Sequence, residues 1–312
     1  MAQDTASNKT VYITGADESY FLLALTLLGS FEKFCPDEKL YICDFDLNEA
    51  QCSFLDHKGI LLPRPKQLAV GLHPYRNKSA IKQYLEGVDY DTVVWIDCDC
   101  LVVGGFSQAV ERIIDSVPSD QPLIASSSDA EGYDIAEFIR RFAPEPFEKL
   151  LKENSTPLDS LYLNCGVFIM RSEAALDEWF KLSVDIPIHP LFEQNVFNML
   201  AYRDFPQVNH LDVDVWNVHD LALNDLEVIR PQPTGPFSVQ LKGKEVLVIH
   251  ATSFQGRAVD FRPLQIPVDA THSIPGLFRF VNNKAVHVLF LEMISLFIVQ
   301  NRELLIEYGV AS

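Results

Sequence analysis

Two aspartates interrupt an apolar run in the segment VVWIDCDCLVVGG, residues 93–105. Removing a carboxylate from water is costly, so charged groups inside such a run need a partner. A β-strand places alternate side chains on one face, so Asp97 and Asp99 point the same way if the strand continues through them. Close carboxylates repel each other unless a proton or cation intervenes, and oxygen ligands suit Mg²⁺ or Mn²⁺. The spacing indicates a divalent-metal site, although alone it also fits two solvated aspartates at a strand end.

The overall composition limits the possible partners. The chain has 312 residues, of which 48% are hydrophobic, and a formal net charge of −18. It lacks the basic surface that general nucleic-acid binding requires, and a phosphate-bearing ligand would need local cations. The polar start has no signal-peptide core, and the six cysteines form neither C-x-x-C pairs nor a disulfide-dense pattern. We expect a reduced, cytoplasmic protein. A thiolate metal site at Cys98 and Cys100 lacks a second pair of ligands at a usable spacing.

Apolar runs alternate with helical patterns along the first 260 or so residues. This alternation predicts an α/β fold with a mainly parallel sheet, in which ligands bind at the carboxyl ends of the strands. The predicted strands lie at 11–14, 40–47, 59–65, 91–100, 123–129, 161–171 and 245–253, and the predicted helices at 20–31, 77–87, 172–182 and 192–202.

The longest apolar stretch is AVHVLFLEMISLFIVQ, residues 285–300, which His287 and Glu292 interrupt. Because a spanning helix needs about 20 apolar residues, we interpret it as a buried or amphipathic helix. We expect a catalytic domain at 1–262 and a C-terminal helical extension at 263–312, packed on that domain or appended to it. The alternative is a peripheral membrane or homo-oligomer contact through this helix.

The segment YDTVVWIDCDCLVV resembles the signature of metal-dependent glycosyltransferases of the GT-A fold. Within these it is similar to the retaining glycosyltransferase family 8, which includes glycogenin and bacterial lipopolysaccharide galactosyl- and glucosyltransferases. Four further segments agree, in the family's order, across roughly residues 9–260. The resemblance implies a Rossmann-like central sheet flanked by helices, a UDP-sugar donor and Mn²⁺ or Mg²⁺. It also implies retaining transfer of a hexose, glucose or galactose, to a hydroxyl of a glycan, lipid-linked or protein acceptor.

The segment VYITGADESYFLLALTLLGS looks like the family's first strand, nucleotide loop and first helix. A short loop at a strand end, with an acceptor and an aromatic ring, is suited to a base and ribose. By resemblance, the residues that contact the uridine are Thr14, Ala16, Asp17, Ser19 and Tyr20.

Two segments resemble the family's sugar-binding motifs. LYLNCGVFIMR is similar to the N-[SA]-G-V strand, so Asn164 would bind the donor sugar and Gly166 would allow close approach. FEQNVFNML resembles the D-Q-D-x-x-N helix start, which would place Gln194 beside the anomeric carbon and Glu193 at the sugar hydroxyls. Glutamate replaces the usual aspartate there. Asp129, after another apolar run, is similar in position to a residue that meets the sugar in relatives.

The segment VLVIHATSFQGR looks like the family's H-[FY]-x-G-x-x-K-P segment. It implies that His250 joins Asp97 and Asp99 as the third metal ligand. The usual lysine is not aligned, and Arg257 is the nearest cation that could bind a diphosphate bidentately. Lys78, for which Arg76 could substitute, matches the basic residue that faces the donor in relatives. The donor-binding set also includes Asp97 and its neighbour Cys98.

Two other functions remain open at this point. A sugar-phosphate nucleotidyltransferase normally needs a glycine-rich basic loop after the first strand, whereas VYITGADES has one glycine and no cation. A degenerate GT-A domain could serve as a nucleotide-binding or assembly module. Retention of the metal-site residues, Asn164 and Gln194 favours an active enzyme.

Overall fold

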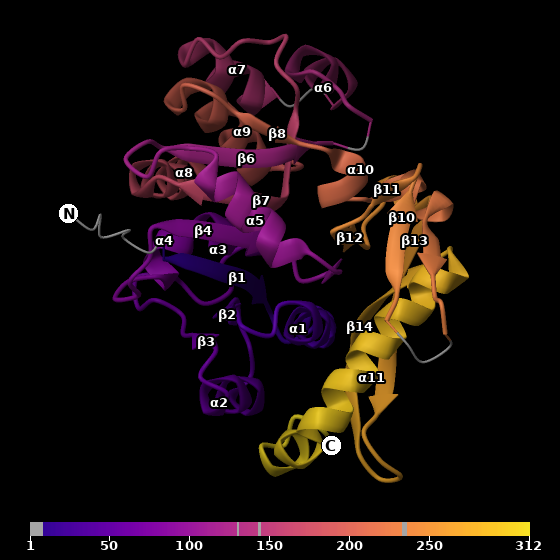
Figure 1. The fold of residues 1–312 in the computed structure, drawn as a ribbon. Coiled ribbons are helices and arrows are strands. Elements are labelled where there is room, and N and C mark those ends of the chain that lie inside the picture. Colours follow the sequence, from indigo (N-terminus) through magenta and orange to yellow (C-terminus); the bar gives the residue numbers. More distant parts are fainter. Residues whose placement is uncertain (1–8, 130, 143–144, 233–235) are drawn as a thin grey trace, which may run out of the picture.

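A seven-stranded sheet forms the centre of the computed structural model, which describes residues 9–129, 131–142, 145–232 and 236–312 (Figure 1). Among its strands, only the one at 163–171 runs antiparallel to its neighbours. The prediction of an α/β fold with a mainly parallel sheet is confirmed. In spatial order the strands are β3 (Leu61–Leu62), β2 (Leu40–Asp44), β1 (Thr10–Ala16), β4 (Thr92–Ile96), β7 (Leu163–Arg171), β6 (Leu123–Ser128) and β8 (Asn209–Leu211).

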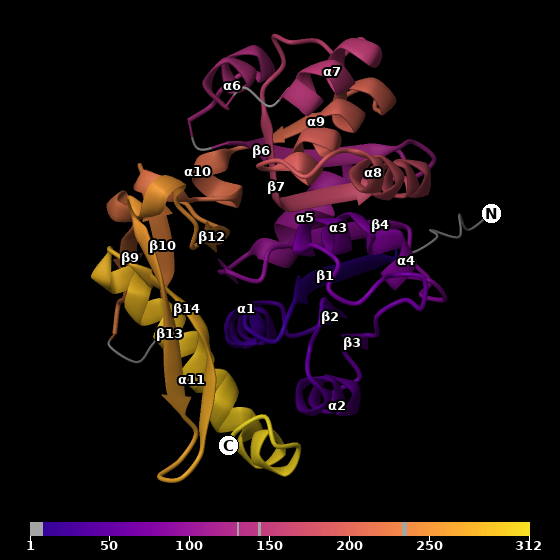
Figure 2. The same ribbon diagram turned by 180° about the vertical axis from the view of Figure 1, so that it is seen from behind.

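Helices cover both faces of this sheet (Figures 1 and 2). Side chains alternate along each buried strand, so Tyr12 and Val94 pack in one apolar core while Ile13 and Trp95 pack in the other. The first core includes α1 (Phe21–Phe34), α2 (Glu49–His57) and α5 (Phe106–Asp115). The second includes α4 (Ile81–Tyr84), α6 (Ile135–Phe142), α7 (Glu145–Glu153), α8 (Glu173–Asp185) and α9 (Phe192–Asp204), and the short α3 (Pro74–Ser79) precedes α4.

The aspartate pair lies in a turn just beyond the sheet. Strand β4 ends at Ile96, and the amide of Cys100 donates to the carbonyl of Asp97 at 3.0 Å. The expectation that strand geometry persists through both aspartates is therefore wrong, and the turn carries them out of the apolar core to the carboxyl end of β4. The chain then forms β5 (Cys100–Val102), which pairs antiparallel with β12 (Val248–His250) in a separate small sheet.

The C-terminal region is only partly helical. A hairpin of β13 (Val259–Pro267) and β14 (Ser273–Val281) comes first, and the helix α11 (Lys284–Glu307) begins only after it. The helical extension expected from residue 263 is corrected accordingly, because β13 continues across that boundary. Prolines within both strands are tolerated because this ribbon has two strands only and its outer edges need no ladder partner.

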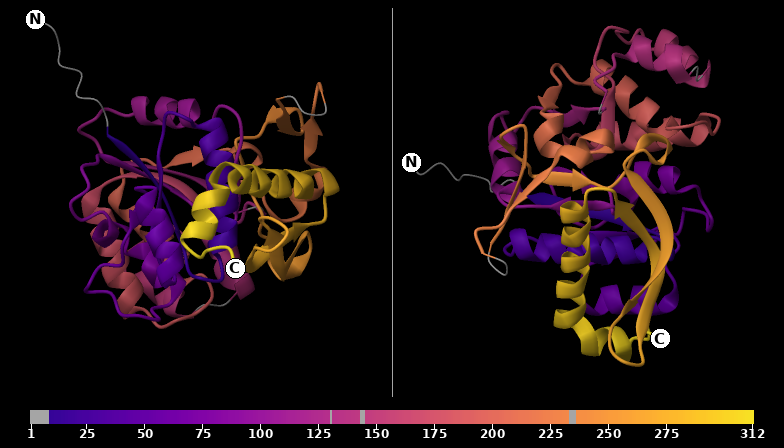
Figure 3. Two further views of the ribbon diagram at one scale, coloured as in Figure 1. Left: turned by 90° about the horizontal axis from the view of Figure 1, so that it is seen from below. Right: turned by 90° about the vertical axis from the view of Figure 1, so that its right-hand side faces the viewer.

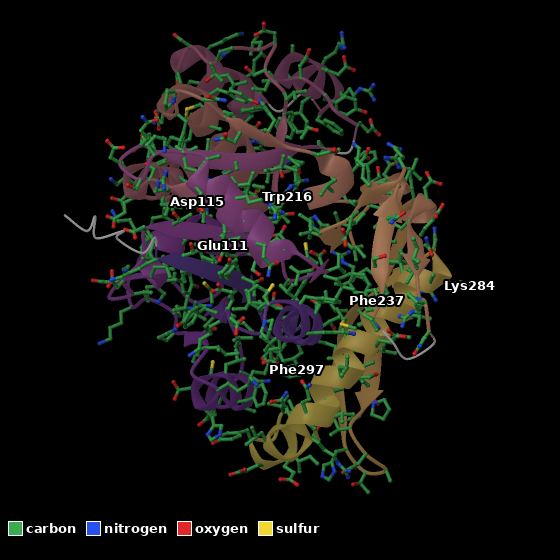
Figure 4. All side chains as sticks on the ribbon, viewed as in Figure 1. Glu111, Asp115, Trp216, Phe237, Lys284 and Phe297 are labelled. Carbon is green, nitrogen blue, oxygen red and sulfur yellow. The ribbon has the colours of Figure 1, made fainter. Side chains whose placement is uncertain are left out.

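The hairpin and α11 lie side by side against α1 (Figures 1 and 3). A Cβ added to Gly29 of α1 would lie 2.3 Å from the carbonyl oxygen of Met293 in α11. A Cβ added to Gly276 of β14 would lie 2.7 Å from Cβ of Leu22. Phe297 lies on α11 (Figure 4). Its ring centroid is 6.1 Å from that of Phe54 in α2. Glycines thus permit the close packing of the C-terminal region on the sheet domain.

Part of the surface of α11 is apolar and exposed, at Val288, Leu296 and Val299. A membrane or oligomer contact through this helix stays a prediction. Among the described residues, no helix combines the length and apolar character needed to cross a membrane. The remaining elements are α10 (Val213–Trp216), the 3₁₀ turns Asp220–Asp225 and Phe254–Gly256, and a three-stranded sheet of β9 (Glu227–Ile229), β10 (Ser238–Leu241) and β11 (Lys244–Glu245).

Candidate active site

A cleft of about 400 Å³ opens where β1 and β4 end and the antiparallel β7 begins. Segments that are far apart in the sequence meet here because these strands are neighbours in the sheet. The predicted site residues that line the cleft are Ala16, Asp17, Tyr20, Lys78, Asp97, Cys98, Asp99, Asn164, Glu193, Gln194 and His250.

Asp97, Asp99 and His250 converge at the floor of the cleft. The Nε2 atom of His250 lies 3.2 Å from Oδ1 of Asp99 and 3.9 Å from Oδ2 of Asp97. His250 reaches this position because the pairing of β12 with β5 places it opposite Cys100, directly after the aspartate turn. One oxygen of each carboxylate therefore lies near the same imidazole nitrogen.

The second oxygen of each carboxylate is held by a cation. Oδ1 of Asp97 accepts hydrogen bonds from Nζ of Lys78 at 2.8 Å and from Nε1 of Trp95 at 2.6 Å. Oδ2 of Asp99 accepts one from Nη2 of Arg279 at 2.9 Å. These outer contacts fix the rotation of both carboxylates and leave the inner oxygens directed at His250.

A chain of amides fixes the orientation of His250. Nδ2 of Asn217 donates to Oδ1 of Asn164 at 3.0 Å, which makes Oδ1 of Asn217 the acceptor that lies 2.9 Å from Nδ1 of His250. The Nδ1 atom then donates to Asn217, and Nε2 faces the carboxylates. Gly166 is required for this arrangement, because an added Cβ would lie 2.5 Å from Cε1 of the imidazole.

The charges at the cleft floor are stable at neutral pH. Burial by itself would raise the pKa of Asp99, but His250 and Arg279 hold that pKa well below its usual range. Burial would lower the pKa of Lys78, but the carboxylate of Asp97 keeps it above its ordinary value. Asp99 is therefore an anion and Lys78 a cation across the physiological range.

The donor set suits a hard divalent cation. Asp99, Cys100 and His250 present ligand atoms that all lie within 4.8 Å of one another. The Cys100 thiol is buried, and a soft sulfur ligand is not typical of Mn²⁺ or Mg²⁺ sites. The carboxylate of Asp99 and the imidazole of His250 suit Mn²⁺ or Mg²⁺. Asp97 lies outside this group of close ligand atoms, and its Oδ2 atom is 3.9 Å from the same imidazole nitrogen.

Glu193 and Gln194 form the opposite wall, at the start of α9. Glu193 is 2% exposed, and burial raises the pKa of its carboxyl to about 7. Its Oε2 atom has no hydrogen-bond partner among the described residues. Oε1 of Gln194 accepts from the amide of Cys165 at 3.1 Å, which ties the helix to β7. This wall thus offers a buried polar group for a ligand hydroxyl.

The loop after β1 also lines the cleft, through Asp17 and Tyr20. Oδ1 of Asp17 accepts from the amide and hydroxyl of Ser19, at 2.9 and 2.7 Å, and from the amide of Tyr20 at 3.0 Å. This turn around Asp17 leads directly into α1. The ring of Tyr20 lies 5.3 Å from that of Phe261, in the C-terminal hairpin.

Four predicted site residues lie outside the described lining of the cleft. Thr14 is buried and Ser19 is exposed. The Oδ1 atom of Asp129 lies 3.9 Å from Nε2 of His219. Arg257 forms ion pairs with Glu131 and Asp220.

The sequence did not predict three residues that hold the expected metal ligands. Asn217 follows a short helix and carries no recognisable signal. Trp95 lies within the apolar strand, where the sequence predicts a core residue. Arg279 is one of few cations in the C-terminal region, but only the pairing of β13 with β14 shows that it reaches Asp99.

Comparisons with known proteins agree with this architecture. No protein-family model and no curated protein matches the sequence. Among solved structures, the glycosyltransferase GlyE of Streptococcus pneumoniae is similar over 97% of this chain and 64% of its own, with TM-score 0.51 and 14% identity. A bifunctional glycosyltransferase, WbbM, covers 69% of this chain and 40% of its own, with TM-score 0.47 and 14% identity. The galactosyltransferase LgtC, solved with donor and acceptor sugar analogues, covers 66% and 74%, with TM-score 0.43 and 16% identity.

These likenesses concern the fold. The chain has the GT-A glycosyltransferase fold that the sequence predicted, and GlyE is similar to it over nearly its whole length. The chain spans less than two thirds of GlyE and 40% of WbbM, so both proteins contain further segments.

Proposed function

We propose that the protein is a metal-dependent retaining glycosyltransferase, which moves glucose or galactose from a UDP-sugar to an acceptor hydroxyl. The observation that carries this proposal is that Asp97 and Asp99 both lie near Nε2 of His250, and that each of the three residues is oriented by a further partner. The glycosyltransferase fold shared with GlyE supports it. A nucleotide loop and a buried polar wall flank the same cleft, as a nucleotide-sugar requires.

The metal site would hold Mn²⁺ or Mg²⁺ through Asp97, Asp99 and His250. When bound, the metal would act as a Lewis acid that stabilises the charge developing on the departing diphosphate. Asn217 holds the imidazole in the tautomer that binding requires, and Lys78 holds the carboxylate of Asp97 in place.

The transfer exchanges one bond for another at the anomeric carbon. The bond to the phosphate oxygen breaks, the bond to the acceptor oxygen forms on the same face, and the acceptor's proton passes to the departing phosphate. Glu193, with a pKa raised to about 7, would bind sugar hydroxyls with Asn164. Gln194 would position the sugar, since an amide is a poor nucleophile. Positioning both substrates in this cleft would supply much of the rate enhancement.

The remaining substrate contacts follow from the walls of the cleft. Uridine would lie against Ala16, Asp17 and Tyr20. The acceptor would be a glycan, a lipid-linked sugar or a protein. A lipid-linked acceptor would be consistent with a peripheral membrane contact through the exposed apolar side chains of α11. A cytoplasmic location would be consistent with the free cysteines.

Calorimetry of UDP binding tests this function. Wild type and Asp99→Ala would be titrated with UDP in Mn²⁺ and in chelator, and UDP-glucose and UDP-galactose then assayed for turnover. We expect tight binding that needs both Mn²⁺ and Asp99. Binding that ignores the metal would indicate a repurposed nucleotide-binding module. No UDP binding in either condition would refute the proposed donor.

A further inference from the structure

The cleft has few fixed positive charges. Among the described residues that line it, the only lysine or arginine side chains are Lys78 and Arg279. They face the carboxylates of Asp17, Asp97, Asp99 and Glu193 in a protein whose formal net charge is −18. A ligand with two phosphate groups would be repelled unless cations offset these charges, either a bound metal or a side chain with hydrogen-bond donors to spare.

Neither Lys78 nor Arg257 meets that need. Lys78 is 5% exposed, and its ammonium group binds Asp97 at 2.8 Å at the base of the cleft. Arg257, the cation that the sequence suggested, lies outside the described lining and is paired with Glu131 and Asp220.

Arg279 has the required geometry. A guanidinium carries five N–H donors, and Nη2 of Arg279 uses one on Oδ2 of Asp99. Its Nε atom is buried and has no hydrogen-bond partner among the described residues. The guanidinium carbon lies 4.2 Å from the ring centroid of Phe261, which fixes the plane of the group. A planar guanidinium that lines the cleft beside Asp99, and that uses one of its five donors there, is suited to a phosphate oxygen.

The hairpin places Arg279 between the nucleotide loop and the metal residues. The amide of Leu277 donates to the carbonyl of Ser19 at 3.0 Å, which joins β14 to the loop. Phe261, opposite Arg279 in the ladder, lies against Tyr20. A nucleotide that extends from Tyr20 to Asp99 must therefore carry its phosphates past Arg279.

We propose that Arg279, which the β13–β14 hairpin supplies, is the diphosphate-binding residue of this protein. The inference rests on the proposed function, because it assumes a nucleoside diphosphate in the cleft. Arg279 holds Asp99 through Nη2 and offers its remaining donors to the diphosphate. Part of the phosphate affinity is consequently independent of the metal.

Calorimetry with three probes tests this role. Wild type, Arg279→Gln and Arg279→Lys are titrated with UDP, uridine and inorganic pyrophosphate, each in Mn²⁺ and in chelator. We expect Arg279→Gln to bind UDP and pyrophosphate about tenfold to a hundredfold more weakly in both conditions, with uridine unchanged. Arg279→Lys keeps the charge and loses the planar fork. Its affinities for UDP and pyrophosphate should lie between those of wild type and Arg279→Gln. Arg262→Gln is the matched control, because Arg262 lies on the same hairpin, is exposed and pairs with Asp260.

The outcomes separate the two proposals. Unchanged UDP and pyrophosphate affinities in both Arg279 variants would overturn the role of Arg279, as would an equal loss for uridine. If Arg279→Gln fails to fold, as thermal unfolding would show, the Arg279→Lys titrations decide. Wild type that binds pyrophosphate but not UDP would refute the proposed donor, and pyrophosphate would still decide the role of Arg279. Wild type that binds neither would overturn both.

Discussion

Asp97 and Asp99 are two residues apart, but different regions of the molecule hold them. Asp97 is held by Lys78 from α3 and Trp95 from β4, which belong to the sheet domain. Asp99 is held by Arg279, which comes from the hairpin that precedes the C-terminal helix. Lys78 lies 19 residues before Asp97 in the sequence, whereas Arg279 lies 180 residues after Asp99.

This difference indicates that Lys78 and Arg279 have different roles. The Lys78 contact is buried in the sheet domain, so it serves mainly to orient Asp97. Arg279 is 18% exposed, lines the cleft and keeps a spare donor, so it can both orient Asp99 and bind ligand. The C-terminal region would then complete the active site as well as covering the sheet domain.

Neutralising Asp99 should have the largest effect. We expect Asp99→Asn to lower sugar transfer by about a hundredfold to a thousandfold, because it removes a charged metal ligand and the anchor of Arg279. Turnover of the UDP-sugar with Mn²⁺ measures this, with the exposed Asp260→Asn as control. Full activity in Asp99→Asn would remove the metal role from the site.

Removing the support of His250 should come next. Asn217→Ala deletes the acceptor for Nδ1 of the imidazole, so Mn²⁺ affinity should fall by about tenfold to a hundredfold. Titration of Mn²⁺ without nucleotide measures it. Asn301→Ala, at a buried asparagine of α11, should bind Mn²⁺ as wild type does. Equal affinities in all three proteins would show that the tautomer of His250 does not matter.

The sheet-domain half of this site was predictable from sequence, and the reasons are physical. Asp97 and Asp99 follow an apolar strand, and His250 ends another, so their chemistry and their position at a sheet edge are local signals. Gly166 was also recognisable, and its reason, the imidazole packed against it, appears only in the structure.

The hairpin half was not predictable. Arg279 reaches the cleft only because β14 pairs with β13 and packs on α1, and such long-range packing leaves no local pattern. Prolines in both strands also argue against a hairpin when only the sequence is considered. They are tolerated because the ribbon has two strands and the outer edges need no further strand. Arg257 was the better candidate by distance along the chain, but the structure pairs it with Glu131 and Asp220.

Glu193 allows a pH test of the wall beside Asp97. Burial raises its pKa from 4.5 to about 7, so the unfolded chain releases the proton first as pH rises. The stability that protonated Glu193 provides is complete below pH 4.5 and is lost as pH approaches 7. We expect this to lower the wild-type free energy of unfolding by about 2 kcal/mol between pH 5 and 8. Glu193→Gln should lack that loss in urea unfolding without metal, and parallel pH profiles would contradict the raised pKa.

Shifting the hairpin should have the smallest effect, and it should act on one aspartate only. A methyl group added in Gly276→Ala would lie 2.7 Å from Cβ of Leu22, so β14 must move away from α1. We expect a stability loss of about 1–3 kcal/mol. UDP affinity should fall about threefold to tenfold, because Arg279 lies on the same strand. Affinity for Mn²⁺ alone should fall less than UDP affinity, because Asp97 and His250 are held by residues outside the hairpin.

Gly104→Ala is the matched control, since a methyl group there meets nothing within 4 Å. A Gly276→Ala protein that loses Mn²⁺ and UDP affinity to the same extent would mean that the hairpin supports the whole site. One that keeps full UDP affinity despite reduced stability would mean that the hairpin serves packing alone, and that the phosphates are held by the metal.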